Sequence, residues 1–339
     1  MTSNRRARDS WQPAVPTTEA AVSGTARALT DEVRASCAAV AERARFVAIQ
    51  REALPAYAAS LPLADVAAPT LDPAYHYLGD ATGNVVFVLT LDSINFGSGY
   101  FPFMRKRGTL SGYFTVALSL KEAFERDGPW GAEELAAMTV DRCAAVFDQA
   151  PDFPLMRLFA QALGDLGRLL LAEYGGQPMA LLGAAGGSAE HLAALLTAMP
   201  FYRDVADYGG QRVAFYKRAQ LAAADLALAL APRPLFHDLD RLTIFADNVV
   251  PHVLRVDGLL RYAPELLARI NAEEPIPPGS PQEIEIRACA VHAVELLKVE
   301  LARLGQQVTA NQLDYYLWNR GRAPHYKALP RHRSPGVYY

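Results

Sequence analysis

Residues 85–97 read Val-Val-Phe-Val-Leu-Thr-Leu-Asp-Ser-Ile-Asn-Phe-Gly, and this stretch decides the fold class. The β-branched and aromatic run at its start is typical of a buried strand. A buried helix has the same unbroken apolarity, and Thr82 is a candidate N-cap residue for one. The pattern by itself therefore favours neither structure, and Gly97-Ser98-Gly99 ends whichever element forms.

The rest of the chain has the periodicity of helices. Residues 61–77 and 275–281 read as proline-punctuated loops, and neither a repeat nor a long linker divides the chain. We expect an all-α protein with a disordered arm at residues 1–17 and one large helical domain at residues 18–339, carrying a small irregular or β insert. Apolar residues recur at helical spacing over residues 18–59, 115–125, 132–148, 154–173, 188–199, 213–230, 249–262, 284–304 and 310–318.

Composition excludes several classes of protein. The chain of 339 residues is 51% hydrophobic and 20% charged, with a net charge of −3. A protein that neutralises many nucleic-acid phosphates normally has a basic excess, so we expect a small anionic ligand and no DNA partner. Cys37, Cys143 and Cys289 form no CxxC pair, the N-terminus lacks the apolar core of a secretory signal, and no apolar run has membrane-spanning length. We expect a cytoplasmic protein that binds no membrane.

The histidine and cysteine spacings match no metal-ligand motif. The glycine-rich stretch at residues 183–188 lacks the GK[ST] of a phosphate loop and a convincing preceding strand, so we interpret it as a loop and helix cap. No GxSxG is present, which leaves no basis for a serine nucleophile. We expect neither a metal nor a cofactor.

Asp92, Asn95 and Phe96 form the first candidate group. In a helix they would share one face, at positions i, i+3 and i+4. A carboxylate, an amide and an aromatic ring beside a glycine-rich turn suit a polar heterocycle. The same residues are also typical of a helix end whose side chains bond nearby backbone groups.

Two further candidates precede apolar helices. Lys217, in Phe215-Tyr216-Lys217-Arg218, is a cation near a helix N-terminus, where phosphate binds well, although a solvated Lys-Arg pair has the same pattern. Asp247 follows an apolar stretch and opens a new helix, with Pro251 near its first turn. Its carboxylate could cap that helix, or it could oppose a developing positive charge beside apolar neighbours.

Several of these segments together resemble one family, the queuosine 5′-phosphate glycosidases of queuine salvage. The resemblance covers residues 72–339 and implies an all-α fold related to the helix-hairpin-helix DNA glycosylases. Residues 85–96 are therefore expected to be helical. The segments that carry the resemblance occur in the family's order: LDSINFG (91–97), FYKRAQLAAADL (215–226), LTIFADNVVPHVL (242–254), EIEIRACAVHAVELL (283–297), LDYYLW (313–318) and HRSPGVYY (332–339).

The resemblance implies hydrolysis of the N-glycosidic bond of queuosine 5′-phosphate, releasing queuine for tRNA modification. Asp247 occupies a position similar to the catalytic aspartate of the DNA glycosylases. The glycine-bearing hairpin with which those enzymes bind DNA is replaced here by the acidic segment 238–242. Asp247 would stabilise a ribosyl cation, and either orient or deprotonate water or attack C1′ itself.

The resemblance also implies roles for other residues. Asp92 and Asn95 suit the base or its cationic amine, Phe96 and Trp318 suit stacking, and Lys217 suits the 5′-phosphate. Residues 97–102 depart from the family, where a bulkier aromatic stretch is common, and this changes the expected shape of the base pocket. Further substrate-binding candidates without an assigned role are His76, Glu285, Asp314 and Tyr315.

Two other functions are compatible with the chain. A nucleic-acid glycosylase acting on a flipped modified base would show duplex binding that weakens steeply with salt. A non-catalytic helical module that binds queuine or a nucleotide would show affinity without release of the base.

Overall fold

The computed structural model describes residues 28–62 and 69–339, so the arm predicted for residues 1–17 lies outside the described residues. The described chain is mainly helical, as the sequence predicts, and no helix within it is both long and apolar enough to cross a membrane. The helices are α1 (Leu29–Ala41), α2 (Leu54–Ser60), α3 (Ala81–Ser93), α4 (Gly112–Asp127), α5 (Ala132–Ala136), α6 (Val140–Phe147), α7 (Pro154–Tyr174), α8 (Pro178–Ala184), α9 (Ala189–Leu196), α10 (Lys217–Ala229), α11 (Val250–Val256), α12 (Pro264–Asn271), α13 (Pro281–Arg303), α14 (Ala310–Arg320) and α15 (Pro324–Lys327). The strands are β1 (Val47–Ile49), β2 (Val205–Tyr208), β3 (Gln211–Ala214) and β4 (Leu260–Tyr262), and short 3-10 turns are η1 (Arg51–Ala53), η3 (Phe101–Phe103), η4 (Pro200–Tyr202) and η5 (Leu239–Arg241).

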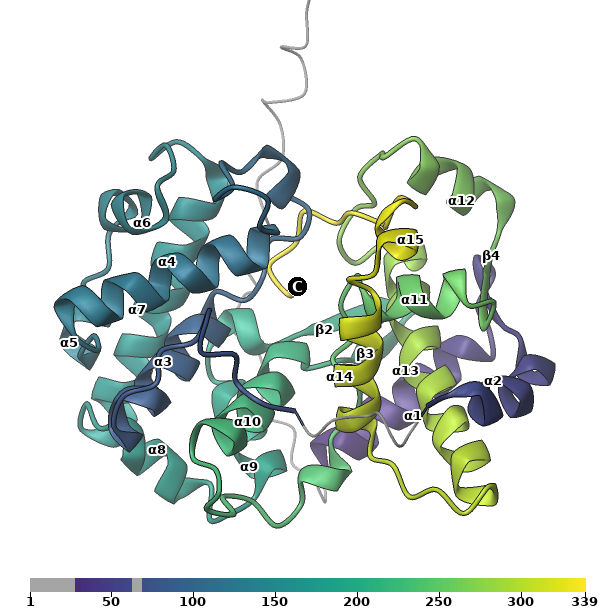
Figure 1. Ribbon diagram of the computed structural model, residues 1–339, viewed down its shortest axis with the longest axis horizontal. Coiled ribbons are helices and arrows are strands. Elements are labelled where there is room, and N and C mark those ends of the chain that lie inside the picture. The colour runs from purple at the N-terminus through teal and green to yellow at the C-terminus, as the bar shows by residue number, and fades with distance from the viewer. Residues whose placement is uncertain (1–27, 63–68) are drawn as a thin grey trace, which may run out of the picture.

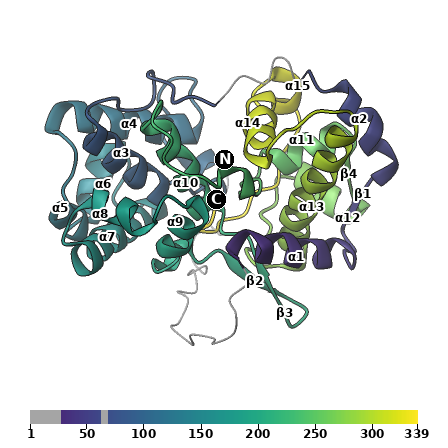
Figure 2. The ribbon, with the colours of Figure 1, turned by 90° about the horizontal axis from the view of Figure 1, so that it is seen from below.

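The helices lie in two groups, which Figures 1 and 2 show side by side. Helices α3 to α10 form the first group, and α1, α2 and α11 to α15 form the second. The hairpin of β2 and β3 packs on α1 and α13 of the second group. This division matters for function, because segments far apart in the sequence face each other across the boundary.

The stretch at residues 85–97, whose pattern favours neither strand nor helix, lies in helix α3 as far as Ser93. The helix begins at the cap residue Asp80, whose carboxylate accepts a hydrogen bond from the Gly83 amide at 2.7 Å, so Thr82 is not the cap. Residues 85–93 are all buried, because α4, α7, α8 and α10 pack around the helix. A helix that is buried on every side has no polar face, which explains why its periodicity did not separate it from a strand. The helix ends at Ser93, so Asn95 and Phe96 lie in the turn that follows it.

Helix α13 is the centre of the second group. The Ser280 hydroxyl caps it by accepting from the Glu283 amide at 3.4 Å, and residues 283–291 are buried without interruption. Helices α1, α2, α11 and α14 pack against it. The helix predicted for residues 284–304 is confirmed.

The strands correct three of the predicted helices. Strand β1 interrupts the helix expected over residues 18–59 and pairs antiparallel with β4, which replaces the end of the helix expected over residues 249–262. Strand β3 pairs with β2 at the start of the helix expected over residues 213–230. Tyr216 and Gly258 separate helix from strand, because both have a positive φ (48° and 84°), which a continuing helix cannot accommodate.

The helix expected over residues 132–148 is also divided. Helix α5 ends at Ala136, and Thr139 starts α6 by accepting a hydrogen bond from the Arg142 amide at 3.2 Å. A side-chain cap in the middle of an apolar period begins a second helix there. The cap predicted at Ser188 is confirmed, since its hydroxyl accepts from the His191 amide at 3.0 Å.

The last residues of the chain connect the two groups. After α15 they run back across the boundary, and Figure 1 shows them ending beside the first group. The main-chain oxygen of Tyr339 accepts from the Gly97 amide at 3.1 Å, and Arg218 donates to the oxygen of Val337 at 2.9 Å. Gly99 permits this close approach, because a Cβ there would lie 2.4 Å from the main-chain oxygen of Ser334. The C-terminal segment thereby forms part of one wall between the groups.

Candidate active site

A cavity of about 680 Å³ lies between the two groups of helices. Its volume is in the range of pockets that hold small molecules. The turn after α3, the start of α4 and helix α10 contribute from one side, and the segment before α11, helix α14 and the C-terminal segment contribute from the other. Eight of the residues predicted from the sequence line it: His76, Asn95, Phe96, Lys217, Asp247, Asp314, Tyr315 and Trp318.

Lys217 is the first residue of α10 and is only 5% exposed. Its amine donates to the main-chain oxygen of Asn95 at 3.4 Å. Burial lowers the pKa of the amine, and three carboxylates oppose this shift, those of Asp247, Asp92 and Asp314. The cation is therefore shared by acidic groups from both sides of the cavity.

Asp247 lies just before α11. Its Oδ1 accepts from the amides of Val249 at 2.7 Å and Val250 at 3.1 Å, although the N-cap residue of α11 is Val249 and the helix itself starts at Val250. No residue in the described part of the chain donates a hydrogen bond to Oδ2. Burial raises the pKa of the carboxyl, whereas Lys217 and the two amides lower it. One oxygen is thus fixed by the backbone, and the other is left for a ligand.

Asp92 lies at the end of α3, is 1% exposed and is not part of the cavity lining. Its Oδ1 accepts from the Asn95 amide group at 3.4 Å, and its Oδ2 is buried without a hydrogen-bond partner among the described residues. Burial raises the pKa of Asp92 to about 7, although Lys217 opposes the shift. Asn95, which is half-buried and lines the cavity, lies between this carboxyl and the ligand space.

The ring of Phe96 is 1% exposed. It meets Phe159 and Phe201 edge-on at centroid distances of 5.3 and 5.8 Å, and the Arg218 guanidinium lies 4.7 Å from its centroid. Little of the ring is left for contact with a base, so stacking by Phe96 stays a prediction. Its packing holds the turn that carries Asn95.

Two further carboxyls face the cavity. Asp314 is on α14, and its Oδ1 accepts from the Phe245 amide at 2.8 Å. Asp225 is on α10 and was not predicted as a site residue. Burial raises the pKa of both groups well above the usual range, with Asp247 adding to the shift of Asp314 and Asp92 to that of Asp225. Asp225 lies about two helical turns after Lys217, and this spacing could have identified it.

Aromatic side chains form another part of the wall. Trp318 meets Tyr113 and Phe114 in edge-on contacts, each with a centroid distance of 5.9 Å. The Nε2 of His76 lies 3.3 Å from the Tyr113 hydroxyl, and burial lowers the pKa of this imidazole. Trp318 and Tyr315 are half-buried, so part of each ring faces the cavity. Such surfaces suit a flat heterocycle.

Glu285 does not lie with the other predicted residues. It is 0% exposed on α13 and outside the cavity lining. Its Oε2 accepts from the amides of Arg45, Phe46 and Val47 at 2.6–3.1 Å, and its Oε1 accepts from the Tyr208 hydroxyl at 2.7 Å. These contacts hold the start of β1 and the β2–β3 hairpin, so the structure places Glu285 in the framework.

Arg287, on the same helix, was not predicted and connects the two central residues. It is 1% exposed and forms two parallel hydrogen bonds with Asp204, at 2.9 and 2.5 Å. Asp204 also accepts from the main-chain amide of Lys217 at 3.1 Å, and Arg287 donates to the main-chain oxygen of Ala246 at 3.0 Å. One buried guanidinium therefore positions both Lys217 and the residue before Asp247.

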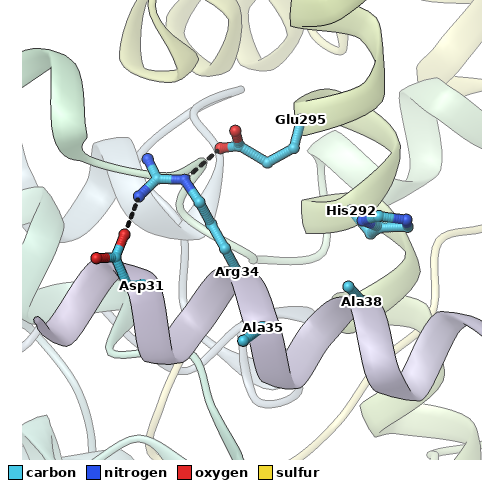
Figure 3. Close-up of a pocket in the computed structure, with 6 residues that line it drawn as sticks. All are labelled: Asp31, Arg34, Ala35, Ala38, His292 and Glu295. Atoms are coloured by element: carbon cyan, nitrogen blue, oxygen red, sulfur yellow. Dashed lines mark ion pairs between the residues drawn. The ribbon is translucent and has the colours of Figure 1, made fainter. Parts of the chain in front are cut away.

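A second, shallow depression lies between α1 and α13 (Figure 3). Arg34 forms ion pairs there with Asp31 at 3.6 Å and Glu295 at 3.3 Å. The charged side chains of this depression are therefore paired with one another at the surface, and the depression is open to solvent. Within residues 28–62 and 69–339, no group of three or more His, Cys, Asp or Glu side chains could hold a metal ion. The cavity between the helix groups is thus the stronger candidate site.

Comparison with known proteins assigns the chain to a family. Residues 75–339 match the family described as Queuosine salvage protein. A protein of Sphaerobacter thermophilus named queuosine 5′-phosphate N-glycosylase/hydrolase is 37% identical over 307 residues, which cover 88% of this chain and 95% of that protein. Proteins of the same name from Bos taurus (32% over 280 residues, 77% and 82% covered) and Mus musculus (32% over 244 residues, 68% and 72% covered) are also similar.

Proposed function

The chain belongs to the queuosine salvage protein family, and on this premise we propose that it hydrolyses the N-glycosidic bond of queuosine 5′-phosphate. The observation that carries the proposal is Asp247, which lines the cavity with one oxygen held by two backbone amides and the other without a partner among the described residues. The bond between C1′ and the base breaks, water supplies the hydroxyl for C1′, and its proton goes to the leaving base. The products are free queuine and ribose 5-phosphate.

The leaving group explains the need for a carboxylate on the sugar side. Queuine is a 7-deazaguanine, in which carbon replaces the nitrogen whose protonation helps a purine leave. The transition state therefore carries its charge on the ribose, and an ionised Asp247 stabilises it. The Lys217 cation and the two amides favour the ionised form against the effect of burial. The same carboxylate can orient or deprotonate water, or attack C1′ itself.

We propose that the base lies against the aromatic wall. Trp318 and Tyr315 offer partly exposed rings, and Asn95 offers an amide toward the guanine-like edge. Asp92 lies behind Asn95 and attracts positive charge in the cavity, such as the amine of queuine, because its Oδ2 has no hydrogen-bond partner among the described residues. Lys217 binds the 5′-phosphate as a cation of the cavity lining, and His76 and Asp314 are further contacts.

We propose that the described residues act as one catalytic domain related to the helix-hairpin-helix DNA glycosylases. The lining of the cavity by both helix groups supports the first part, and the position of Asp247 before α11 supports the second. The segment 238–242, which replaces the DNA-binding hairpin, forms hydrogen bonds within the protein. The carboxylate of Asp238 accepts from the Ser188 hydroxyl and the Ala189 amide, each at 2.6 Å. This supports a nucleotide over DNA as the substrate. The cysteines Cys37, Cys143 and Cys289 are buried and free, which supports a cytoplasmic setting.

The test is incubation of the purified protein with queuosine 5′-phosphate and detection of free queuine by mass spectrometry. We expect queuine and ribose 5-phosphate in equal amounts. Binding of the nucleotide without release of queuine would reject hydrolysis and favour a non-catalytic module. Salt-sensitive binding of duplex DNA, with release of a base from it, would favour a nucleic-acid glycosylase.

A further inference from the structure

Arg331 is a cation of the cavity wall without a bonded partner in the described part of the chain. It lies in the C-terminal segment after α15 and is half-buried. Across the described residues, its guanidinium makes no hydrogen bond, ion pair or ring contact. The other guanidinium groups of the wall are engaged: Arg333 pairs with Glu273 at 2.8 Å, and Arg322 lies 4.9 Å from the ring centroid of Phe114 and donates to Asn319 at 3.2 Å.

The electrostatic setting of Arg331 differs from that of Lys217. Lys217 is surrounded by the carboxylates of Asp247, Asp92 and Asp314, which balance its charge. Burial lowers the pKa of Arg331, and the carboxylate of Asp247 opposes the shift, while Arg333 adds to it. A partly desolvated cation without a bonded partner is costly, so this position favours an anionic ligand.

The backbone holds Arg331 in place. The main-chain oxygen of Pro330 accepts from Arg255 at 3.1 Å, and the main-chain oxygen of Arg333 accepts from the Ile276 amide at 2.8 Å. His332, between them, is 2% exposed. Because the main chain is held on both sides of Arg331, less backbone freedom is lost when the residue binds a ligand, which favours a binding role.

We propose that Arg331 binds the 5′-phosphate of the substrate and makes the enzyme prefer the nucleotide to the free nucleoside. This inference rests on the proposed function. Queuosine 5′-phosphate carries one strongly anionic group, and the planar guanidinium can donate two parallel hydrogen bonds to its oxygens. Arg331 and Asp247 are close enough for their charges to interact, yet no ion pair joins them, which leaves room for the ribose 5′ end beside the carboxylate. Lys217 then contacts the phosphate from the other side of the cavity.

Calorimetry in a catalytically impaired background tests the inference without consuming the ligand. In Asp247→Asn protein, adding Arg331→Met should weaken binding of queuosine 5′-phosphate roughly ten- to hundredfold, because a charge-assisted contact is lost. Binding of the free nucleoside should change less than about threefold. Arg331→Lys keeps the positive charge but cannot donate two parallel hydrogen bonds, so it should recover part of the affinity. Arg333→Met is the matched control and should affect both ligands equally.

A second measurement does not depend on the proposed function. Inorganic phosphate should raise the melting temperature of the wild-type protein, and Arg331→Met should reduce this rise while Arg333→Met preserves it. Equal loss of affinity for nucleotide and nucleoside, or unchanged phosphate stabilisation, would overturn the role of Arg331. Failure of the wild-type protein to bind either substrate would reject the proposed function instead, and the phosphate measurement would still decide whether Arg331 binds an anion. If Arg331→Met does not fold, Arg331→Gln, which also removes the charge, replaces it in both measurements.

Discussion

Replacing Asp247 by Asn removes one negative charge at the point where the ribosyl cation develops. The Asn side-chain oxygen can keep the hydrogen bonds from Val249 and Val250, at 2.7 and 3.1 Å in the wild type, so the start of α11 should survive. A unit charge about 4 Å from the developing cation contributes about 4 kcal/mol at an effective dielectric constant of about 20. Lys217 already interacts with this charge, so we expect a loss between roughly a hundredfold and a thousandfold in rate.

The assay is single-turnover release of queuine, measured together with substrate affinity and melting temperature. Affinity should be largely retained, because the charge acts mainly when the cation forms. Asp238→Asn is a matched control: Asp238 also accepts backbone amides at a helix start, at α9, and does not line the cavity. It should leave the rate unchanged. A folded Asp247→Asn protein with a near wild-type rate would refute the catalytic role, and lost activity with a collapsed melting temperature would support only the capping role.

Three other predictions concern the same cavity. Lys217→Ala should reduce turnover of queuosine 5′-phosphate much more than turnover of the nucleoside, and equal reductions would make Lys217 a structural residue. Asp92→Asn should weaken queuine binding in calorimetry; in the wild type the affinity should rise as the pH increases through about 7, because the carboxyl then ionises, and a flat pH profile would place recognition of the amine elsewhere. Exhaustive chelation should leave activity intact, and a loss on EDTA that zinc restores would contradict the expected metal independence.

Local patterns in the sequence predicted the features that depend on neighbouring residues. The apolar period of α13 and the Ser188 hydroxyl before α9 required no knowledge of distant contacts. Asp247 belongs to the same class, because its capping bonds reach only two and three residues ahead. Where the backbone reverses its φ, at Tyr216 and Gly258, the same helical periodicity ran on into strands β3 and β4 and gave wrong helix boundaries.

The sequence by itself determined the helical class, the family and eight of the residues that line the cavity, because these follow from local periodicity and from segments with a recognisable order. Only the tertiary structure decided that Lys217 lies among carboxylates from α3, α14 and the segment before α11. It also decided that Glu285 lies outside the cavity and binds the backbone before β1, that Arg287 positions the residue before Asp247, and that Arg331 lines the cavity. The physical reason is that burial, charge pairing and the absence of a partner are properties of the space between distant segments, and no single segment contains them.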